Sequence, residues 1–360
     1  MKICLINNLY KPYDRGGAER VVEIMSEAYI KEGHEIIVIT TKPYSNKISN
    51  FQFPISNENI KIFQIPGLYY NLSKLPLISR LTWHVWDMFD AVSCYRVKRI
   101  LEKEKPDLIV THNLKGIGYL IPGMIRKLEI EHYHYLHDIQ LVYPSGLLYF
   151  GEEKKLDSAA AIFYQRICAQ LLGSPNKVIS PTNWLINLHQ ERGFFSNSKI
   201  EVKKSAIGDS ILRTKDENGG FNFLFVGQVE KHKGVETLIE AFGGSKGNAE
   251  LLIVGEGGFL ASLKERAGQN SRIKFFGRKS REEVEKIMAV ADCLVVPSLC
   301  YENAPAVIFE ACRAGLPVIA SRIGGIPELI EKCGGALFTP GDASELRRLM
   351  SRVQAGEKML

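Results

Sequence analysis

Three kinds of segment are absent from this 360-residue sequence, and each absence excludes a class of protein. No apolar run reaches the roughly 18 residues that a membrane-spanning helix needs. The apolar N-terminus, residues 1–7, is too short for a secretion signal and is predicted to form the first strand of a sheet. No G-x-G-x-x-G motif follows that strand. The second predicted strand ends at Thr40-Thr41-Lys42, where a ribose-binding acid would be expected, which argues against a nicotinamide-binding domain.

Cysteine is scarce and irregularly spaced. The seven cysteines are odd in number and no two form a Cys-x2-Cys pair, so the sequence predicts neither a zinc site nor a disulfide framework. We expect them to be buried free thiols in a reducing cytoplasm. They stand at positions 4, 94, 168, 293, 300, 312 and 333.

Composition and charge describe an ordinary globular protein. Hydrophobic residues make up 45% of the chain and charged residues 24%, and the length is sufficient for two domains, each with its own core. The formal net charge is +6. Residues 1–206 hold 26 Lys and Arg against 20 Asp and Glu, whereas residues 207–360 hold 20 of each, so the excess lies in the first part. A basic first part fits contact with an anionic membrane or an acidic acceptor, and equally a plain solvated surface.

Apolar strands alternate with helical patterns along most of the chain, which predicts βαβ units and parallel sheets. The first strand, Lys2–Asn7, is followed by a loop containing Gly16 and Gly17 and then by a helix to about Lys31. The second strand is predicted at Ile36–Thr40.

The most informative stretch, residues 297–321, predicts a strand end, a loop, a helix and a further strand. Pro305 suits the first helical position, with Asn303 or Ala304 as the cap. Gly315 stands just past the expected end of the helix, and the apolar residues after it predict a buried strand.

Two carboxylates give this unit a chemical interest. Glu302 lies in the loop before the helix and Glu310 lies inside it, so that a helix N-terminus stands between them. A helix N-terminus favours phosphate, and a carboxylate on each side can accept hydrogen bonds from sugar hydroxyls. The pattern therefore fits a sugar–diphosphate–ribose ligand. The plain alternative is a solvated helix glutamate and a loop charge, since surface Glu is common.

The stretch from Pro297 to Glu328, including P-S-x3-E-N-A-P-x4-E-A and G-G-x-P-E, closely resembles glycosyltransferase family 4. Members of that family are retaining enzymes of the GT-B fold and carry a Glu-x7-Glu element, which Glu302 and Glu310 match. The resemblance implies an α/β protein in which two Rossmann-like parallel-sheet domains face each other across a cleft.

We predict an N-terminal acceptor-side domain at residues 1–206, a linker at 207–220 and a C-terminal nucleotide-sugar-binding domain at 221–360. The polar run 214–220 is the clearest break in pattern. Family members usually continue into a helix that returns to the first domain. Because this sequence stops at Leu360, we expect that crossover to be short or absent.

The resemblance also implies site residues. Glu310 would bind the ribose hydroxyls and Glu302 the sugar hydroxyls, while Lys233, near a helix start, would bind the diphosphate. Gln228 stands where members usually carry Arg, so phosphate binding would depend more on Lys233. The alternative for Lys233 is an ordinary surface lysine. The alternative for the loop with Gly16 and Gly17 is an ordinary turn between a strand and a helix. The other donor-binding candidates are Gly16, Gly17, Arg278, Asn303, Ala304, Ala306 and Val307.

Family members place a histidine at a strand end against the donor sugar. By that likeness we predict His137 as a catalytic-site residue, with Asp138 supporting it. His112 and His134 are rival candidates, and a histidine without a role is the remaining alternative.

Aromatic side chains are concentrated in residues 66–70 and 81–89, and the cations Arg96, Lys98 and Arg99 follow. This combination fits a segment that faces a membrane or an acceptor. Aromatic residues at helical spacing belong more often to an ordinary core, which is the plain alternative.

The resemblance to family 4 implies a retaining glycosyltransferase that moves a sugar from a UDP- or GDP-sugar to a glycan or lipid-linked acceptor. We expect a role in cell-surface polysaccharide or glycoconjugate synthesis, in the cytoplasm and at the inner face of the cell membrane if the basic first part meets lipid. No cofactor and no nucleic-acid partner is expected. No divalent metal is expected either, since no Asp-x-Asp motif stands at a suitable strand end. The leaving phosphate would take the acceptor proton, so no protein nucleophile is assigned.

Two alternatives remain at this point. Gln228 is compatible with a catalytically idle sugar-nucleotide-binding subunit of a biosynthetic complex. A sugar-nucleotide epimerase shares the expected fold, but its resemblance would lie elsewhere in the chain.

Overall fold

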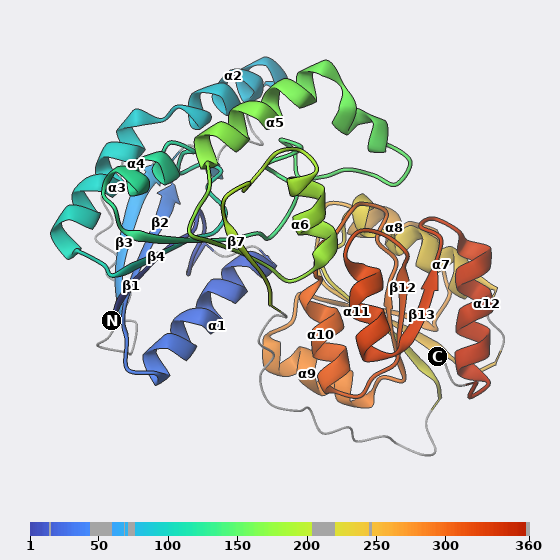
Figure 1. Ribbon diagram of the computed structural model, residues 1–360. Helices are drawn as coiled ribbons and strands as arrows, with labels where there is room; N and C mark the ends of the chain where they lie inside the picture. The colour runs from blue at the N-terminus through green and yellow to red at the C-terminus, as the bar shows by residue number, and fades with distance from the viewer. Residues whose placement is uncertain are drawn as a thin grey trace. The chain divides into compact units, whose positions relative to one another are not determined.

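The computed structural model (Figure 1) describes residues 1–13, 16–43, 60–67, 69–70, 76–203, 220–244 and 247–357, apart from the side chains of residues 77, 78 and 81. The chain forms two compact units. One comprises Met1–Gly146 and Leu156–Lys204, and the other comprises Leu147–Lys155 and Ser205–Leu360. The predicted linker at 207–220 lies outside the described residues except for Gly220. The predicted domain limits therefore stay a prediction.

The first unit contains a seven-stranded parallel sheet in the order β3-β2-β1-β4-β5-β6-β7. The central strands are buried on both faces, which is why their sequences are continuous apolar runs such as Ile36–Ile39. The strands are β1 (Lys2–Ile6), β2 (Glu35–Pro43), β3 (Ile60–Gly67), β4 (Leu108–Thr111), β5 (Glu131–Tyr135), β6 (Lys177–Ser180) and β7 (Lys199–Val202).

Helices cover both faces of this sheet. Helices α3, α4 and α5 pack in sequence along one face, and α1 lies on the other, where Val22 joins a buried cluster with residues of β1 and β2 (Figure 1). The helices are α1 (Gly17–Lys31), α2 (Leu77–Met88), α3 (Ala91–Glu104), α4 (Ile121–Lys127), α5 (Ala159–Leu172) and α6 (Asn183–Gln190).

The second unit contains a six-stranded parallel sheet in the order β10-β9-β8-β11-β12-β13. Two parallel-sheet, Rossmann-like domains are therefore present, as the sequence predicts. The strands are β8 (Asn222–Val226), β9 (Glu250–Val254), β10 (Ile273–Gly277), β11 (Cys293–Val296), β12 (Val318–Ser321) and β13 (Gly335–Phe338).

Alternate side chains of this sheet enter two separate cores. Phe223 and Phe225 of β8 pack into a cluster with α7, α8 and α12, whereas Leu224 between them packs into a cluster with α9, α10 and α11. The helices are α7 (Val235–Gly243), α8 (Leu260–Ala267), α9 (Arg281–Val290), α10 (Ala306–Arg313), α11 (Ile326–Cys333) and α12 (Ala343–Gln354), with a short 3₁₀ turn at η3 (Lys231–Lys233).

The cysteine prediction is wrong for one pair. Cys312, on α10, is joined by a disulfide to Cys333, at the end of α11. The two residues are 21 positions apart in the sequence, and they meet because α10 and α11 pack against each other beside the same sheet. The remaining five cysteines are free thiols, as predicted, and all but Cys94 are buried.

Within the described part of the chain, no helix is both long enough and apolar enough to cross a membrane.

Candidate functional site

The loop between β11 and α10 carries Glu302 at the carboxyl end of the second sheet. Helix α10 begins at Ala306 with Pro305 as its N-cap, one position later than predicted, because Pro305 keeps an extended ψ of 120°. At the other end Gly315 has a φ of +60°, and the N–H of Leu316 donates to the Ala311 carbonyl at 2.9 Å. The helix therefore closes at Gly315 as predicted.

The Glu302 carboxylate is held on both oxygens. The Nζ of Lys233 donates to Glu302 Oε2 at 2.9 Å, and the Ser298 hydroxyl donates to Oε1. The Lys233 and Glu302 side chains are 24% and 15% exposed, so the pair is partly desolvated without being sealed from solvent. Burial lowers the pKa of Lys233, but the Glu302 charge and its hydrogen bond outweigh burial and raise that pKa above its ordinary value. Lys233 is therefore a permanent cation.

Two glycines bring the backbone close enough to form this pair. Gly234 has a φ of +67°, and a Cβ there would lie 1.8 Å from the carbonyl oxygen of Pro297. Gly324 has a φ of +61°, and a Cβ there would lie 2.1 Å from the carbonyl oxygen of Glu302. Only glycine fits either position. The two glycines thus fix the loop that carries Glu302 between η3 and the start of α11.

Glu310, the second acid of the predicted pair, lies half-buried in α10. Burial raises the pKa of Glu310, and the charges of Arg281 and Arg313 act in the opposite direction. At the first turn of the same helix Ala306 is exposed and Val307 half-buried, while Asn303 is buried in the preceding loop and Ala304 is half-buried.

The remaining predicted donor residues of the second unit follow neighbouring strands of the same sheet. Gln228 stands just after β8 and Arg278 just after β10, and both are exposed. Because parallel strands end at one edge, Gln228, Lys233, Arg278 and Glu302 all follow strands at the carboxyl edge of this sheet. The sequence missed Ser298 as a partner of Glu302, although it lies inside the motif that identified that acid.

Gly16 and Gly17 stand at the start of helix α1 in the first unit, after the loop that follows β1. Gly16 is the N-cap, and its N–H donates to the Glu19 carboxylate at 2.9 Å. Glu19 is 7% exposed, so the loop is held by a buried acid that the sequence did not single out. A capping role for Glu19 could have been predicted from its position three residues after Gly16.

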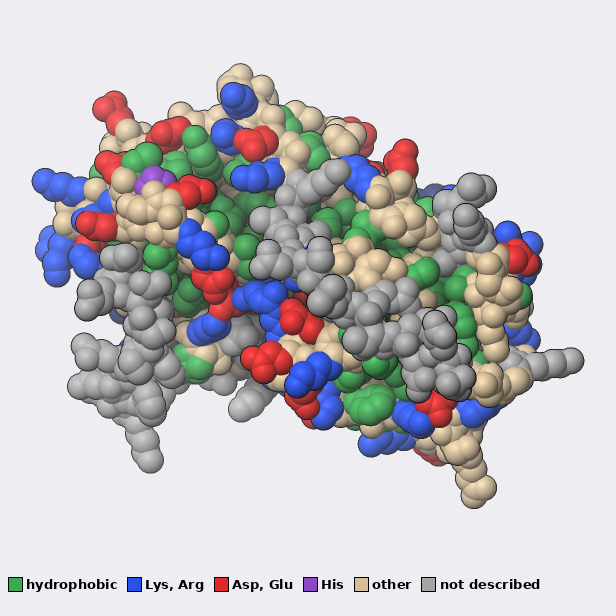
Figure 2. Space-filling view, turned by 90° about the horizontal axis from the view of Figure 1, so that it is seen from below, with side chains coloured by type: hydrophobic (Ala, Val, Ile, Leu, Met, Phe, Trp, Pro, Cys, Tyr) green, Lys and Arg blue, Asp and Glu red, His purple; other side chains and the backbone are tan. Residues whose placement is uncertain are grey.

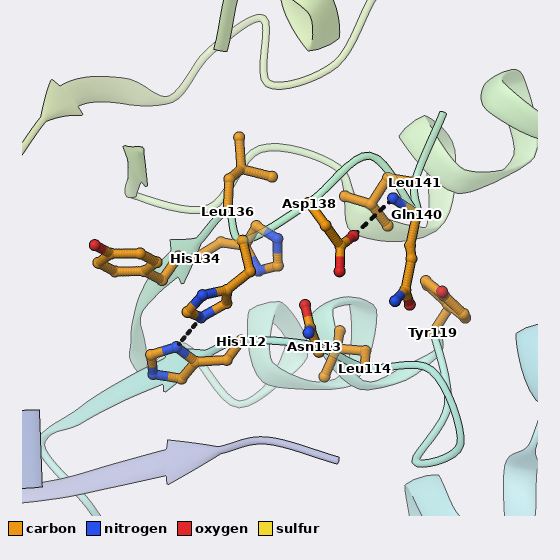
Figure 3. A pocket seen from close by; sticks show the side chains of 11 residues that line it. His112, Asn113, Leu114, Tyr119, His134, Leu136, Asp138, Gln140 and Leu141 are labelled. Carbon is orange, nitrogen blue, oxygen red and sulfur yellow. Dashed lines mark hydrogen bonds between the residues drawn. The ribbon is translucent and has the colours of Figure 1, made fainter. Parts of the chain in front are cut away.

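His137 and His112 are partners rather than rivals. Their rings meet through His112 Nδ1 and His137 Nε2 at 2.8 Å, beside a small cavity at the carboxyl ends of β4 and β5 (Figure 3). Tyr135 stacks on both rings, with centroids 5.6 Å from His112 and 4.8 Å from His137. His134, also at this cavity, hydrogen-bonds through Nδ1 to the Thr111 hydroxyl at 2.8 Å.

The cavity holds uncharged imidazoles and one buried acid. Burial lowers the pKa of His137 to about 3, and burial together with the charges of His137 and His134 lowers that of His112 well below its ordinary value. Burial raises the pKa of Asp138, although its carboxylate accepts the Gln140 N–H at 2.7 Å (Figure 3). Each neutral imidazole has one N–H to donate, so this site offers hydrogen bonds without positive charge. His112 Nε2 has no partner among the described residues.

No group of three or more His, Cys, Asp or Glu side chains among the described residues is arranged to hold a metal ion.

The surface charge of the described residues is mixed: on the face drawn in Figure 2, basic and acidic side chains lie among one another.

Two family models match consecutive parts of the chain. The model described as Glycosyltransferase Family 4 matches residues 15–203, more than half of the 360 residues. The model described as Glycosyl transferases group 1 matches residues 213–360.

Individual proteins are also similar to this chain. An uncharacterized 42.6 kDa protein in the cps region of Klebsiella pneumoniae is 26% identical over 91% of this chain and 87% of its own length. The amylovoran biosynthesis glycosyltransferase AmsK of Erwinia amylovora is 35% identical over 37% of this chain and 36% of its own length.

The fold has counterparts among solved structures. The structure of Anabaena Alr3699/HepE in complex with UDP superposes with a TM-score of 0.72 at 20% identity, and the match covers 100% of this chain and 92% of that one.

Proposed function

Since this chain belongs to glycosyltransferase family 4 and has the GT-B fold, we propose that it transfers a sugar from a nucleoside diphosphate sugar to an acceptor with retention of anomeric configuration. The observation that carries the proposal is the Lys233–Glu302 pair beside the start of α10. A fixed cation, a carboxylate and free helix N–H groups form a surface that suits a diphosphate with a sugar attached.

The donor would be bound by charge and by hydrogen bonds. Lys233 and the N–H groups of Ala306 and Val307 would neutralise the diphosphate, while Glu302 accepts from sugar hydroxyls and Glu310 from the ribose. Because Lys233 is already held as an ammonium group by Glu302, the phosphates would not have to charge or orient it at the moment of reaction. Gln228, which is uncharged, would add hydrogen bonds and leave the electrostatic stabilisation to Lys233.

Transfer on the same face needs no protein nucleophile in this scheme. The leaving phosphate would accept the proton of the attacking hydroxyl while Lys233 and the helix N–H groups stabilise its growing charge. A neutral His137, oriented by His112, would contribute a hydrogen bond to the donor sugar without repelling positive charge that develops at the sugar carbon. No metal and no cofactor is assigned a role, and the donor base is uracil or guanine.

Substitution of Lys233 and Glu302 tests the assignment. Glu302→Gln and Lys233→Ala should each lower turnover about 100-fold or more, because each removes a group aimed at charge or hydroxyls in the transition state. Lys231→Ala, in the same 3₁₀ turn with an exposed side chain, is the matched control and should be close to unchanged. Unaltered turnover in Glu302→Gln would contradict the proposal, whereas donor binding without any turnover in the unsubstituted chain would favour an idle sugar-nucleotide-binding subunit.

For the acceptor we propose a glycan or lipid-linked intermediate of cell-surface polysaccharide or glycoconjugate synthesis. The support is the relative AmsK, whose name places it in amylovoran biosynthesis. We assign the protein to the cytoplasm, where nucleotide sugars are made.

We further propose peripheral contact with an anionic membrane through the surface at the α2–α3 corner. Five large apolar side chains there are between 50% and 61% exposed, and the exposed cations Arg96 and Arg99 follow on α3. Aromatic and aliphatic side chains beside cations suit the boundary between lipid headgroups and acyl chains. The five residues are Val85, Trp86, Phe89, Val92 and Tyr95.

Sedimentation with vesicles tests this contact. The chain should bind vesicles that contain phosphatidylglycerol more tightly than pure phosphatidylcholine vesicles, and a Trp86→Ser, Phe89→Ser variant should lose most of that binding. Phe276→Ser, which alters a 39% exposed aromatic residue of the second unit, serves as the control. Equal binding by all three proteins would exclude this surface as the membrane contact.

A further inference from the structure

A nine-residue segment from the first half of the chain belongs to the second unit. This segment, Leu147–Lys155, is called the strap here. Tyr149 of the strap forms an antiparallel bridge with Cys300, which lies two residues before Glu302. On one side of the bridge the Phe150 N–H donates to the Leu299 carbonyl at 2.9 Å. On the other side the Tyr301 N–H donates to the Leu148 carbonyl at 2.8 Å.

A side-chain contact closes the strap over the loop. The Tyr301 hydroxyl donates to Glu153 Oε1 at 2.6 Å, and the Gly151 N–H donates to the same oxygen at 2.9 Å. The Tyr301 hydrogen bond is the main reason that the pKa of Glu153 lies below its ordinary value. Glu153 is therefore an anion near neutral pH, and its bond to Tyr301 is a charge-assisted one.

Among the described residues, three backbone anchors hold the loop that ends at Glu302, and the strap provides one of them. The first anchor is the Leu299 N–H, which donates to the His232 carbonyl at 2.9 Å. The last is the carbonyl of Glu302 itself, which accepts the Gly325 N–H at 2.9 Å. The strap holds Tyr301 between them. Without it, Tyr301, the residue directly before Glu302, would lose its backbone hydrogen bond to Leu148 and its side-chain hydrogen bond to Glu153.

We propose that Glu153 and Tyr301 are positioning residues for the transfer reaction, and that they act by fixing the backbone that carries Glu302. The inference rests on the proposed function, because Glu302 is the group whose placement is at stake. A displacement of about 1 Å in a catalytic group can cost about 100-fold in rate, so a contact outside the donor site can control turnover. The strap is thus part of the catalytic scaffold although it precedes the second sheet by more than 60 residues of sequence.

Single substitutions separate positioning from a merely structural role. Glu153→Gln and Tyr301→Phe should each lower kcat by about 10-fold or more, while the dissociation constant for the free nucleoside diphosphate changes by less than about 2-fold. The nucleoside diphosphate is the chosen probe because it lacks the sugar that Glu302 would contact. Glu152→Gln is the matched control, since Glu152 is the neighbouring acid and pairs with Lys155 at 2.6 Å instead of with Tyr301.

A cross-link across the bridge provides a rescue. Tyr149 and Cys300 face each other as a non-hydrogen-bonded antiparallel pair, because the two backbone hydrogen bonds join the residues on either side of them. In such a pair the Cα atoms are typically about 4.5 Å apart, a distance that a disulfide can span. Tyr149→Cys should therefore form a disulfide with the free thiol of Cys300 on mild oxidation, detected as the loss of two titratable thiols under denaturing conditions. In the double variant Tyr149→Cys, Glu153→Gln, oxidation should restore most of the lost kcat, and reduction should remove it again.

The outcomes are distinct. Normal kcat in Glu153→Gln and Tyr301→Phe would overturn the positioning role, as would a parallel loss of nucleoside diphosphate affinity. Failure of the introduced thiol to react with Cys300 would overturn the geometry, and this readout needs no activity. An unsubstituted chain that turns over no nucleotide sugar would instead refute the proposed function.

Discussion

At the scale of single residues, the site depends on close approaches between backbone segments that are distant in the sequence, and no local sequence pattern predicts them. The G-G pair before Pro327 and the glycine after Lys233 are visible in the sequence, but the reason for them is not. Gly234 and Gly324 each face a backbone carbonyl from a distant segment at a distance that leaves no room for a side chain. The sequence could therefore point to Glu302 and Lys233 and could not show that they form a pair.

We predict that Gly234→Ala disrupts the donor site. Its Cβ would lie 1.8 Å from the Pro297 carbonyl oxygen, so the backbone must move. Gly268→Ala is the control: Gly268 also has a positive φ, +57°, yet nothing lies within 4 Å of its Cβ position. In thermal unfolding Gly268→Ala should cost about 1 kcal/mol and Gly234→Ala at least about 3 kcal/mol. Equal costs would show that this close approach is not required.

We also predict that the buried His189 contributes to acid sensitivity. His189 is fully buried, its Nδ1 lies 2.8 Å from the Leu185 carbonyl, and burial lowers the pKa of His189 to about 4. The unfolded chain, with a His pKa of about 6.5, binds the proton first as pH falls. The stability that neutral His189 provides is thus complete above pH 6.5 and is lost as pH falls toward 4.

Replacement by Phe removes this titration. In His189→Phe the decrease in unfolding free energy between pH 7 and pH 5 should be smaller than in the unsubstituted protein by about 2 kcal/mol. Denaturant unfolding at both pH values measures the difference. Phe194→Leu, which alters a neighbouring ring without a titratable group, should keep the original pH dependence. An unchanged pH dependence in His189→Phe would contradict the assignment.

At the scale of elements, two helix starts of the second unit follow from local sequence signals. Ser280 and Glu283 cap α9 reciprocally, and the Asp342 carboxylate accepts the Glu345 N–H at the start of α12. Such caps can be recognised in a sequence because donor and acceptor are three residues apart. The disulfide was missed because Cys312 and Cys333 approach only after two helices pack on one sheet. The strap was missed for the same reason, since its partners lie about 150 residues away.

We predict that the disulfide stabilises the α10–α11 pair without being needed for the fold. The disulfide joins residues 21 positions apart and so restricts the unfolded chain, which should contribute about 3 kcal/mol to the unfolding free energy. Cys333→Ser should lower the unfolding temperature by several degrees, and dithiothreitol should do the same to the unsubstituted protein but not to the variant. A variant that unfolds at the original temperature would show that the bond adds nothing to stability.

At the scale of the whole molecule, the alternation of strands and helices predicted parallel sheets, and the family resemblance implied that two such domains are present. The second unit was the more predictable one, because its motif places Glu302, Glu310 and the end of α10 within 12 residues of sequence. The site residues of the first unit were less predictable from the sequence. Its candidate histidines end different strands, and only the sheet order, with β4 beside β5, brings His112 to His137.

The most direct test of the central claim, that the second unit binds a nucleoside diphosphate sugar through Lys233, is thermal unfolding with UDP-, GDP- and ADP-sugars. With chelator present, a sugar of the right base at about 100 times its dissociation constant should add about 2.7 kcal/mol of stability, seen as an upward shift of a few degrees. Lys233→Ala should lose that shift and Lys231→Ala should keep it. No shift with any of the sugars, or an equal shift in Lys233→Ala, would contradict the account.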